Sequence, residues 1–361
     1  MQKANNSPNN KKDFEKLKRI LTIIGESLKE YFKQSVEKET NATPHQISIV
    51  DVTSQDFRSS RSKTHFVTYN LESELGKHVV YLIVKFSKDE EAYIKEISNY
   101  EILASSLKNY PCVLVPPIIY KSAKNKCIIY EAGLGIDVKS NISEDDSLKL
   151  AAKTLALIHG IGAKEIDVEP YKTVILFLIS LLNNEDLEQE LIDLLVPSLA
   201  ILQKSKGSAV IHGDFHKSNL KMVIDSSSDR SSLTEQDCEK VKVYVFNSEF
   251  IEANRDRCED IGAYFALDVI TEYKSTKSFT STKNKVMKFI YEYDKTLTEI
   301  GVEQDLQSMY PDGYTIDFHI ATYILYDIID SIKNENLPIN SPKIQTNLEL
   351  LRALLRERPF A

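Results

Sequence analysis

Residues Val210–Val223 read V-I-H-G-D-F-H-K-S-N-L-K-M-V, and the rest of the chain is best interpreted from this stretch. Apolar residues flank it on both sides, which predicts a strand, a tight loop and a second strand. An Asp and an Asn on one loop suit phosphoryl transfer, because the Asp can accept a proton from a hydroxyl and the Asn amide oxygen can ligate Mg²⁺. The spacing from Asp214 to Asn219 lets both groups reach one small space from a single turn of chain.

This loop resembles the catalytic loop of the aminoglycoside phosphotransferase/choline kinase family, which includes methylthioribose kinases and has a protein-kinase-like fold. The family pattern is H-G-D-x-x-x-x-N, and all four specified positions match here. The resemblance implies that Asp214 is the catalytic base, that His212 supports the catalytic loop, and that Asn219 is a metal ligand. It also implies ATP and Mg²⁺ as cofactors.

A second family motif, a strand that ends in I-D-x-E, has its counterpart at Val243–Phe250. Asn247 stands where the family has the metal-binding Asp, and Glu249 matches the Glu. Because Mg²⁺ prefers anionic oxygen, Asn247 should weaken metal binding, whereas Glu249 could compensate from the same side of an extended segment. We expect metal ligands at Asn219, Asn247 and Glu249, and keep a catalytically weak or silent nucleotide- or partner-binding module as the alternative.

The composition is that of an ordinary globular protein, with 361 residues, 42% of them apolar and 27% charged. A net charge of −8 argues against a nucleic-acid binder. The N-terminus lacks the apolar core of a signal peptide, and the longest nearly apolar run, 174–182, is short of the ~20 residues that span a bilayer. Four cysteines without metal or CxxC spacing indicate reduced thiols. We therefore expect a cytoplasmic protein without a nucleic-acid or membrane partner.

The first 12 residues are polar and Asn-rich, which predicts a disordered tail. From residue 13, apolar residues recur at three- and four-residue steps, which predicts an added N-terminal helix within 13–44. This helix could mediate a homodimer, lie on a membrane surface or pack against the first lobe. Packing is favoured, because the polar face carries charges of both signs.

Three strands are expected at 47–52, 66–71 and 79–86. The polar stretch 55–64 predicts a loop whose backbone N–H groups, with Ser59 and Ser60, could contact phosphates of ATP; a solvated hairpin loop is the alternative. Lys85 lies in the apolar third strand, where an ammonium needs a partner. The resemblance assigns it to the phosphates and to a helix Glu.

A helix is expected at about 90–107. Glu96 shares a face with the apolar residues of this helix and is the expected partner of Lys85; Glu101, one stripe over, competes for that role. Two more strands, at 113–120 and 127–130, lead to Glu131 and Ala132, which the element order makes candidates for an ATP-binding hinge.

A helix should start at Ser143, a capping residue followed by three acids. Its end, Leu155–His159, resembles the family's L-A-x-L-H helix beneath the catalytic loop, and His159 is expected to be a packed structural histidine. Asp260–Ala263 reads D-I-G-A, as in methylthioribose kinases. Asp260 is expected to hold the catalytic loop by hydrogen bonds.

These observations predict an α+β, two-lobed protein-kinase-like fold. A small antiparallel sheet with one helix should occupy 45–132 and bind the nucleotide, and a larger, mainly helical lobe should occupy 133–361 and hold the catalytic loop and acceptor pocket. The expected function is ATP-dependent transfer of the γ-phosphate to a hydroxyl of a small molecule such as a sugar, an amino alcohol or an aminoglycoside.

Overall fold

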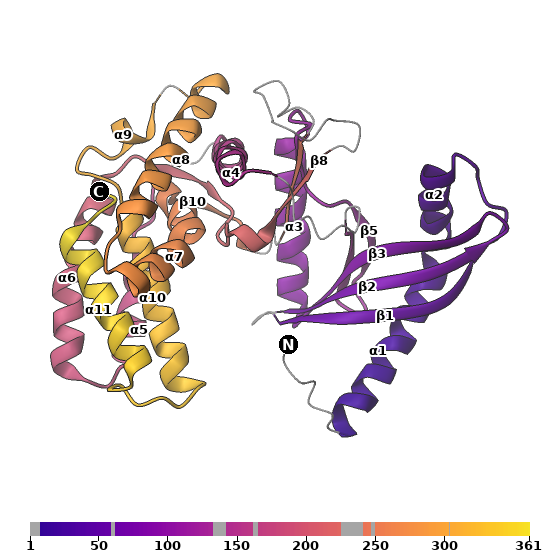
Figure 1. Ribbon diagram of the computed structural model, residues 1–361, viewed down its shortest axis with the longest axis horizontal. Coiled ribbons are helices and arrows are strands. Elements are labelled where there is room, and N and C mark those ends of the chain that lie inside the picture. The colour runs from indigo at the N-terminus through magenta and orange to yellow at the C-terminus, as the bar shows by residue number, and fades with distance from the viewer. Residues whose placement is uncertain are drawn as a thin grey trace. The chain divides into compact units, whose positions relative to one another are not determined.

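The computed structural model describes residues 8–58, 62–132, 142–161, 165–224, 241–246, 250–302 and 304–361. The chain divides into two compact units, one of Met1–Ser98 with Pro116–Asp137 and one of Asn99–Val115 with Val138–Ala361. The predicted α+β fold is confirmed, because the first unit holds a five-stranded antiparallel sheet and the second is mostly helical (Figure 1). The lobe boundary at residue 132 stays a prediction.

The first unit is a twisted sheet between helices. Its elements are α1 (Pro8–Ser27), α2 (Lys29–Thr40), β1 (Ser48–Arg58), β2 (Ser62–Ser73), β3 (Gly76–Ser87), α3 (Glu90–Leu107, whose second half belongs to the other unit), β5 (Ile118–Ser122) and β6 (Cys127–Glu131). The strands lie in the order β1-β2-β3-β6-β5, and each neighbouring pair is antiparallel. The helix expected at 90–107 is confirmed.

The first three strands are longer than predicted, and the loop expected at 55–64 is mostly strand. Phe57 pairs with Thr64 and Arg58 with Lys63, so β1 and β2 continue their ladder almost to the turn. Polar composition misled the prediction, because backbone hydrogen bonds between strands do not depend on apolar side chains. Ser59 and Ser60 lie outside the described residues.

The N-terminal segment forms two helices rather than one, and both pack within the first unit. Leu28 separates α1 from α2. The apolar side of both helices joins the side chains of β2 and β3 in one core. These core residues include Leu21, Ile24, Leu28, Phe32, Val36, Val67, Tyr69, Leu82 and Val84. The Tyr69 hydroxyl donates to the carbonyl oxygen of Leu21 at 2.8 Å. Of the three roles considered for the N-terminal helix, the structure describes packing against the first lobe.

The second unit combines short strands with most of the helices. Its elements are β4 (Val113–Leu114), α4 (Glu144–His159), α5 (Glu169–Ser180), α6 (Glu185–Lys204), β7 (Ser208–Ile211), a 3₁₀ turn (Lys217–Asn219), β8 (Leu220–Ile224), β9 (Val241–Val245), β10 (Glu252–Asp256), α7 (Arg257–Thr276), α8 (Thr280–Glu299), α9 (Leu306–Met309), α10 (Ile316–Lys333) and α11 (Pro342–Glu357). Strand β7 pairs with β10, and β4, β9 and β8 form a separate sheet. None of the helices in the described ranges has the length and apolar character to cross a membrane.

The strand expected at 113–120 is interrupted. Pro116 and Pro117 lack the N–H that a ladder needs, so β4 ends before them and β5 begins after them. Strand β4 pairs with β9 in the second unit, and β5 pairs with β6 in the first.

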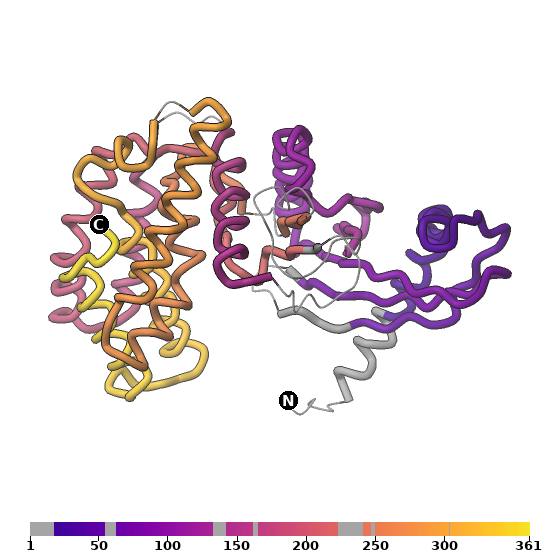
Figure 2. Tube along the Cα trace, turned by 45° about the horizontal axis from the view of Figure 1, so that its top comes forward, coloured from indigo at the N-terminus to yellow at the C-terminus, as the bar shows by residue number. Residues whose placement is uncertain are grey.

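Helix α7 packs against α10 and α8, among the side-by-side helices of the second unit (Figure 2). Gly262 permits this packing, because a Cβ there would lie 2.7 Å from the Cβ of His319 on α10. The buried Asp256 caps the helix and accepts a hydrogen bond from His319 at 2.7 Å. Burial opposes its ionisation, but the hydrogen bonds from His319 and Thr315 hold the pKa of Asp256 below its usual range.

Adjacent isoleucines test the packing of α1. Ile24 is 3% exposed and Ile23 is 69% exposed. We expect Ile24→Ala to lower the free energy of unfolding by about 2–5 kcal/mol, because it leaves a cavity, and Ile23→Ala to change it by about 0.5 kcal/mol or less. Urea unfolding measures both. Equal losses would mean that α1 does not pack on the sheet as described.

Candidate active site

The loop between β7 and β8 is sharply turned at Gly213. Its φ of +76° is a conformation that side chains rarely adopt, and a Cβ there would collide with the carbonyl oxygen of Phe250. Glycine is therefore required between His212 and Asp214. After this turn the chain leaves the direction of β7, and Asp214 begins the loop segment that ends at Asn219.

Asp214 and Asn219 are brought together by hydrogen bonds. The Asn219 amide nitrogen Nδ2 lies 2.9 Å from Asp214 Oδ2 and 2.8 Å from the Asp214 carbonyl oxygen. Since both bonds use the nitrogen side of the amide, Asn219 Oδ1 is left for another partner. About a quarter of the Asp214 side chain is exposed.

Asp260 holds the loop from its buried side. Its carboxylate is 0% exposed and accepts the backbone N–H of His212 at 2.7 Å and that of Gly213 at 2.9 Å. His159 Nε2 lies 3.1 Å from the same carboxylate. These bonds fix the turn that precedes Asp214. Sequence analysis expected Asp260 to hold the loop by hydrogen bonds of this kind.

His212 and His159 are buried, uncharged supports. His212 donates from Nε2 to the carbonyl oxygen of Phe246 at 2.8 Å, which links the loop to the end of β9. His159 Nδ1 lies 2.7 Å from the Tyr293 hydroxyl. Burial lowers the pKa of both histidines, against the opposing charge of Asp260, so both stay neutral at pH 7.

The first unit contains a buried ion pair. Lys85 Nζ on β3 lies 3.0 Å from Glu96 Oε1 on α3, and their side chains are 5% and 2% exposed. The Tyr130 hydroxyl on β6 donates to the same Glu96 oxygen at 2.5 Å. Because strand side chains alternate, Lys85 faces α3 while Val84 faces the core under α1 and α2. Of the two candidate acids, Glu96 is the one that the structure pairs with Lys85.

The hinge candidates use their N–H groups within the sheet. Glu131 donates its N–H to the Pro117 carbonyl oxygen at 3.0 Å, and Ala132 donates to the Tyr81 carbonyl oxygen at 3.3 Å. An adenine contact through either residue would therefore use a carbonyl oxygen. A role for Glu131 and Ala132 in ATP binding stays a prediction.

Several predicted site residues lie outside the described part of the chain: Ser59, Ser60, Asn247 and Glu249. Among the residues that are described, no group of three or more His, Cys, Asp or Glu side chains could hold a metal ion. The metal-binding set expected from the sequence, Asn219 with Asn247 and Glu249, stays a prediction.

Sequence analysis missed two anchors of the loop. Phe215 is 0% exposed and packs its ring against His212 and Tyr264. Lys217 forms an ion pair with Asp268 on α7 at 2.7 Å. An aromatic residue within a polar loop was the signal for the first anchor, whereas the second depends on the fold and had none.

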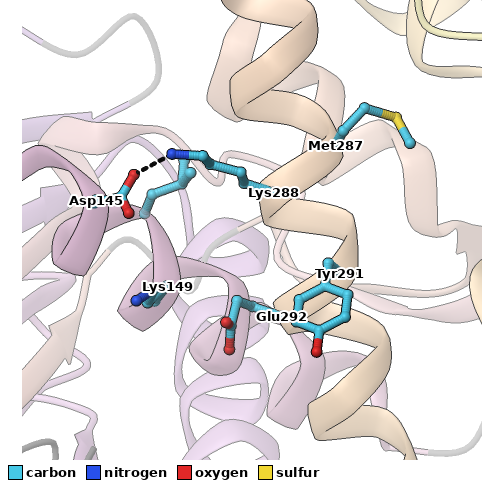
Figure 3. A pocket seen from close by; sticks show the side chains of 7 residues that line it. Asp145, Lys149, Met287, Lys288, Tyr291 and Glu292 are labelled. Atoms are coloured by element: carbon cyan, nitrogen blue, oxygen red, sulfur yellow. Dashed lines mark hydrogen bonds and ion pairs between the residues drawn. The ribbon is translucent and has the colours of Figure 1, made fainter. Parts of the chain in front are cut away.

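A separate pocket of about 370 Å³ lies between α4 and α8 in the second unit (Figure 3). Leu148 is part of its lining, and Met287 and Tyr291 project from α8. Lys288 spans one side to reach Asp145 at 2.7 Å. None of the predicted site residues lines this pocket.

The buried ion pair gives a test of the first unit. Glu96→Ala should lower the free energy of unfolding by about 3–5 kcal/mol, because it leaves the Lys85 ammonium buried without its carboxylate. Glu101→Ala, on an exposed part of the same helix, should cost less than about 1 kcal/mol. Chemical unfolding compares the two, and a larger loss for Glu101→Ala would contradict the assignment.

Two aspartates of α7 contact the catalytic loop in different ways, which gives a matched comparison. Asp260→Asn places an amide N–H₂ against backbone donors and should cost about 2–3 kcal/mol. Asp268→Asn removes a partly exposed ion pair and should cost about 1 kcal/mol or less. Hydrogen exchange of the His212 and Gly213 amides should accelerate only in Asp260→Asn. Unchanged exchange there would contradict the holding role.

Comparisons with known proteins give structural likenesses only. No protein-family model matches the sequence, and no curated protein matches it. The chain is similar in structure to an ethanolamine kinase of Plasmodium vivax, at 15% identity over 84% of this chain and 82% of that one, with a TM-score of 0.48. It is also similar to an ADP-bound aminoglycoside phosphotransferase, at 15% identity over 89% and 97% of the two chains, with a TM-score of 0.48. A choline kinase of Streptococcus pneumoniae matches at 13% identity over 91% and 98%, with a TM-score of 0.48.

Proposed function

We propose that this protein is an ATP-dependent phosphotransferase that moves the γ-phosphate to a hydroxyl of a small molecule. The observation that carries the proposal is the Asp214–Asn219 pair, held on one loop by hydrogen bonds and anchored by the buried Asp260. A carboxylate beside an amide, on a loop that cannot shift without breaking buried bonds, suits in-line phosphoryl transfer.

Asp214 would act as the base. Its carboxylate accepts a hydrogen bond from Asn219, and the side chain is 24% exposed. It would orient the acceptor hydroxyl and take its proton while the oxygen bonds to the γ-phosphorus and the bond to ADP breaks. Such a proton transfer contributes roughly 10²–10⁴-fold to the rate.

Lys85 would neutralise phosphate charge. Its ammonium lies 3.0 Å from Glu96, in a buried ion pair. The Glu96 carboxylate, itself held by Tyr130, would fix the direction of the lysine toward phosphate oxygens. Burying two charges costs desolvation free energy, and the ion pair regains little of it as stability. This cost favours a functional reason for the pair.

Mg²⁺ fits the donor chemistry of the loop. The amide orientation of Asn219 leaves Oδ1, a hard oxygen ligand, unused by Asp214. With Asn247 and Glu249 it would hold the ion, which supplies positive charge to the transferring phosphate when bound. The acceptor class that we propose, a sugar, an amino alcohol or an aminoglycoside, follows from the resemblance. A cytoplasmic location is proposed from the cysteine pattern, which indicates reduced thiols.

The second candidate is a catalytically weak or silent module that binds a nucleotide or a partner. It is favoured by Asn247, because a neutral amide in place of a carboxylate removes one negative charge from the metal site. The two candidates share nucleotide binding and differ in turnover.

Two measurements distinguish them. We expect ATP with Mg²⁺ to raise the free energy of unfolding of the parent by ~2.7 kcal/mol at a hundredfold excess over Kd, as followed by thermal unfolding. EDTA should reduce this gain. A panel of hydroxyl acceptors should then reveal transfer that Asp214→Asn lowers by roughly 10²-fold or more without removing the ATP-dependent gain.

Other outcomes assign the protein differently. Binding without transfer by the parent, together with transfer by Asn247→Asp, would favour the silent module. No stabilisation at any ATP concentration would exclude both candidates.

A further inference from the structure

A buried arginine that the proposed chemistry does not use begins a series of hydrogen bonds toward the catalytic loop. Arg257 is the first residue of α7 and is 6% exposed. Its Nη1 lies 3.0 Å from the Tyr293 hydroxyl on α8, and its buried Nε makes no hydrogen bond within the part of the chain that the structure describes. Burying a charged group with an unbonded N–H costs free energy, which favours a role beyond packing.

Donor and acceptor chemistry gives this series one direction. Burial lowers the pKa of His159, Asp260 raises it, and the charge of Arg257 adds to the lowering, so the ring stays neutral at pH 7. His159 Nε2 lies 3.1 Å from Asp260 Oδ2 and carries the hydrogen, because a carboxylate only accepts. Nδ1 is then the acceptor, and the Tyr293 hydroxyl, 2.7 Å away, donates to it. The Tyr293 oxygen in turn accepts from Arg257, so every hydrogen points from Arg257 toward Asp260.

The series ends on the helix where it begins. Arg257 and Asp260 are three residues apart on α7, so their side chains lie on one side of that helix. Between them the hydrogen bonds pass through Tyr293 on α8 and His159 on α4. Asp260 then accepts two backbone N–H groups of the catalytic loop. Three helices are thus tied to the loop by one closed set of hydrogen bonds.

We infer that Tyr293 and Arg257 are positioning residues, which hold the His159 ring in the orientation that Asp260 requires to fix the catalytic loop. Tyr293, His159 and Asp260 are each 0% exposed, so water does not replace a hydrogen bond that is lost. Loss of the Tyr293 hydroxyl would leave Nδ1 without its donor and Arg257 Nη1 without its acceptor. The consequence for transfer rests on the proposed function, so the first test does not use activity.

Hydrogen exchange tests the link to the loop. We expect Tyr293→Phe, which removes only the hydroxyl, to accelerate exchange of the His212 and Gly213 amides about tenfold relative to the amides of α11. The comparison with α11 removes any change that is common to the whole unit. Tyr291→Phe is the matched control, because Tyr291 lies on the same helix and is 69% exposed, and it should leave exchange unchanged. Unchanged relative exchange in Tyr293→Phe would overturn the inference.

Two variants of the arginine test the start of the series. Arg257→Met replaces the guanidinium by an apolar chain of similar length, and it should accelerate exchange of the same loop amides. Arg257→Lys, whose ammonium can donate to the Tyr293 oxygen, should recover part of this change. Equal exchange in the parent and in Arg257→Met would remove Arg257 from the inference. If Arg257→Met does not fold, Tyr293→Phe and Arg257→Lys decide it.

The ring itself gives a spectroscopic readout. The ¹⁵N chemical shifts of an imidazole distinguish the Nε2–H tautomer from the Nδ1–H tautomer and from the imidazolium. We expect the Nε2–H form for His159 in the parent at a pH of about 7, and a shift of the Nδ1 signal toward that of an unbonded acceptor in Tyr293→Phe. An Nδ1–H form or an imidazolium in the parent would overturn the inference, even in an inactive protein.

Kinetics tests the consequence for Asp214. Tyr293→Phe should lower kcat about threefold to tenfold with a smaller change in KM for ATP, because the base is held less firmly. Tyr291→Phe should change neither value. Full kcat in Tyr293→Phe would overturn the positioning role. A parent without activity on any acceptor would count against the proposed function alone, and hydrogen exchange with the ring tautomer would then decide the inference.

Discussion

The catalytic loop depends on one buried carboxylate. Asp260 is fully buried, and a charge in that environment is tolerated only when hydrogen bonds replace water. The two backbone N–H groups of His212 and Gly213, with the His159 ring, supply those bonds. The dependence is mutual, because the same bonds fix the left-handed turn at Gly213. The loop therefore cannot move from α7 without leaving both a carboxylate and two backbone donors unsatisfied.

Each unit contains a buried carboxylate, and the two carboxylates are stabilised by different partners. In the second unit a buried acid, Asp260, is stabilised by two backbone donors and one neutral histidine ring, that of His159. In the first, Glu96 is stabilised by a buried cation, Lys85, and a tyrosine hydroxyl. The lysine arrangement is the more demanding one, because it buries two charges that apolar residues could replace. Structural stability alone does not explain Lys85, which is why we propose that it binds phosphate.

Sequence reasoning performed best where the signal was local. The helix at 90–107, the Ser143 cap of α4 and the tight loop between two strands within 210–223 followed from spacing and side-chain chemistry. It failed where pairing between distant segments decided the outcome, as in the β1–β2 ladder through 55–64 and the split of 113–120 between two sheets. The choice of Glu96 over Glu101 needed the helix to be placed on its sheet, and the Lys217–Asp268 pair needed the loop to be placed on α7.

An Asn in place of an Asp at position 247 removes one negative charge from the expected metal ligands. Asn219 donates hydrogen bonds to Asp214, and Asp260 on α7 accepts those of the preceding backbone N–H groups of His212 and Gly213. Asp214, the proposed base, is thus supported by the loop and by α7. A neutral residue at position 247 would lower the affinity for Mg²⁺, because one carboxylate is lost from the ligands. The cost of Asn247 should therefore appear as a requirement for more metal rather than as a misfolded catalytic loop.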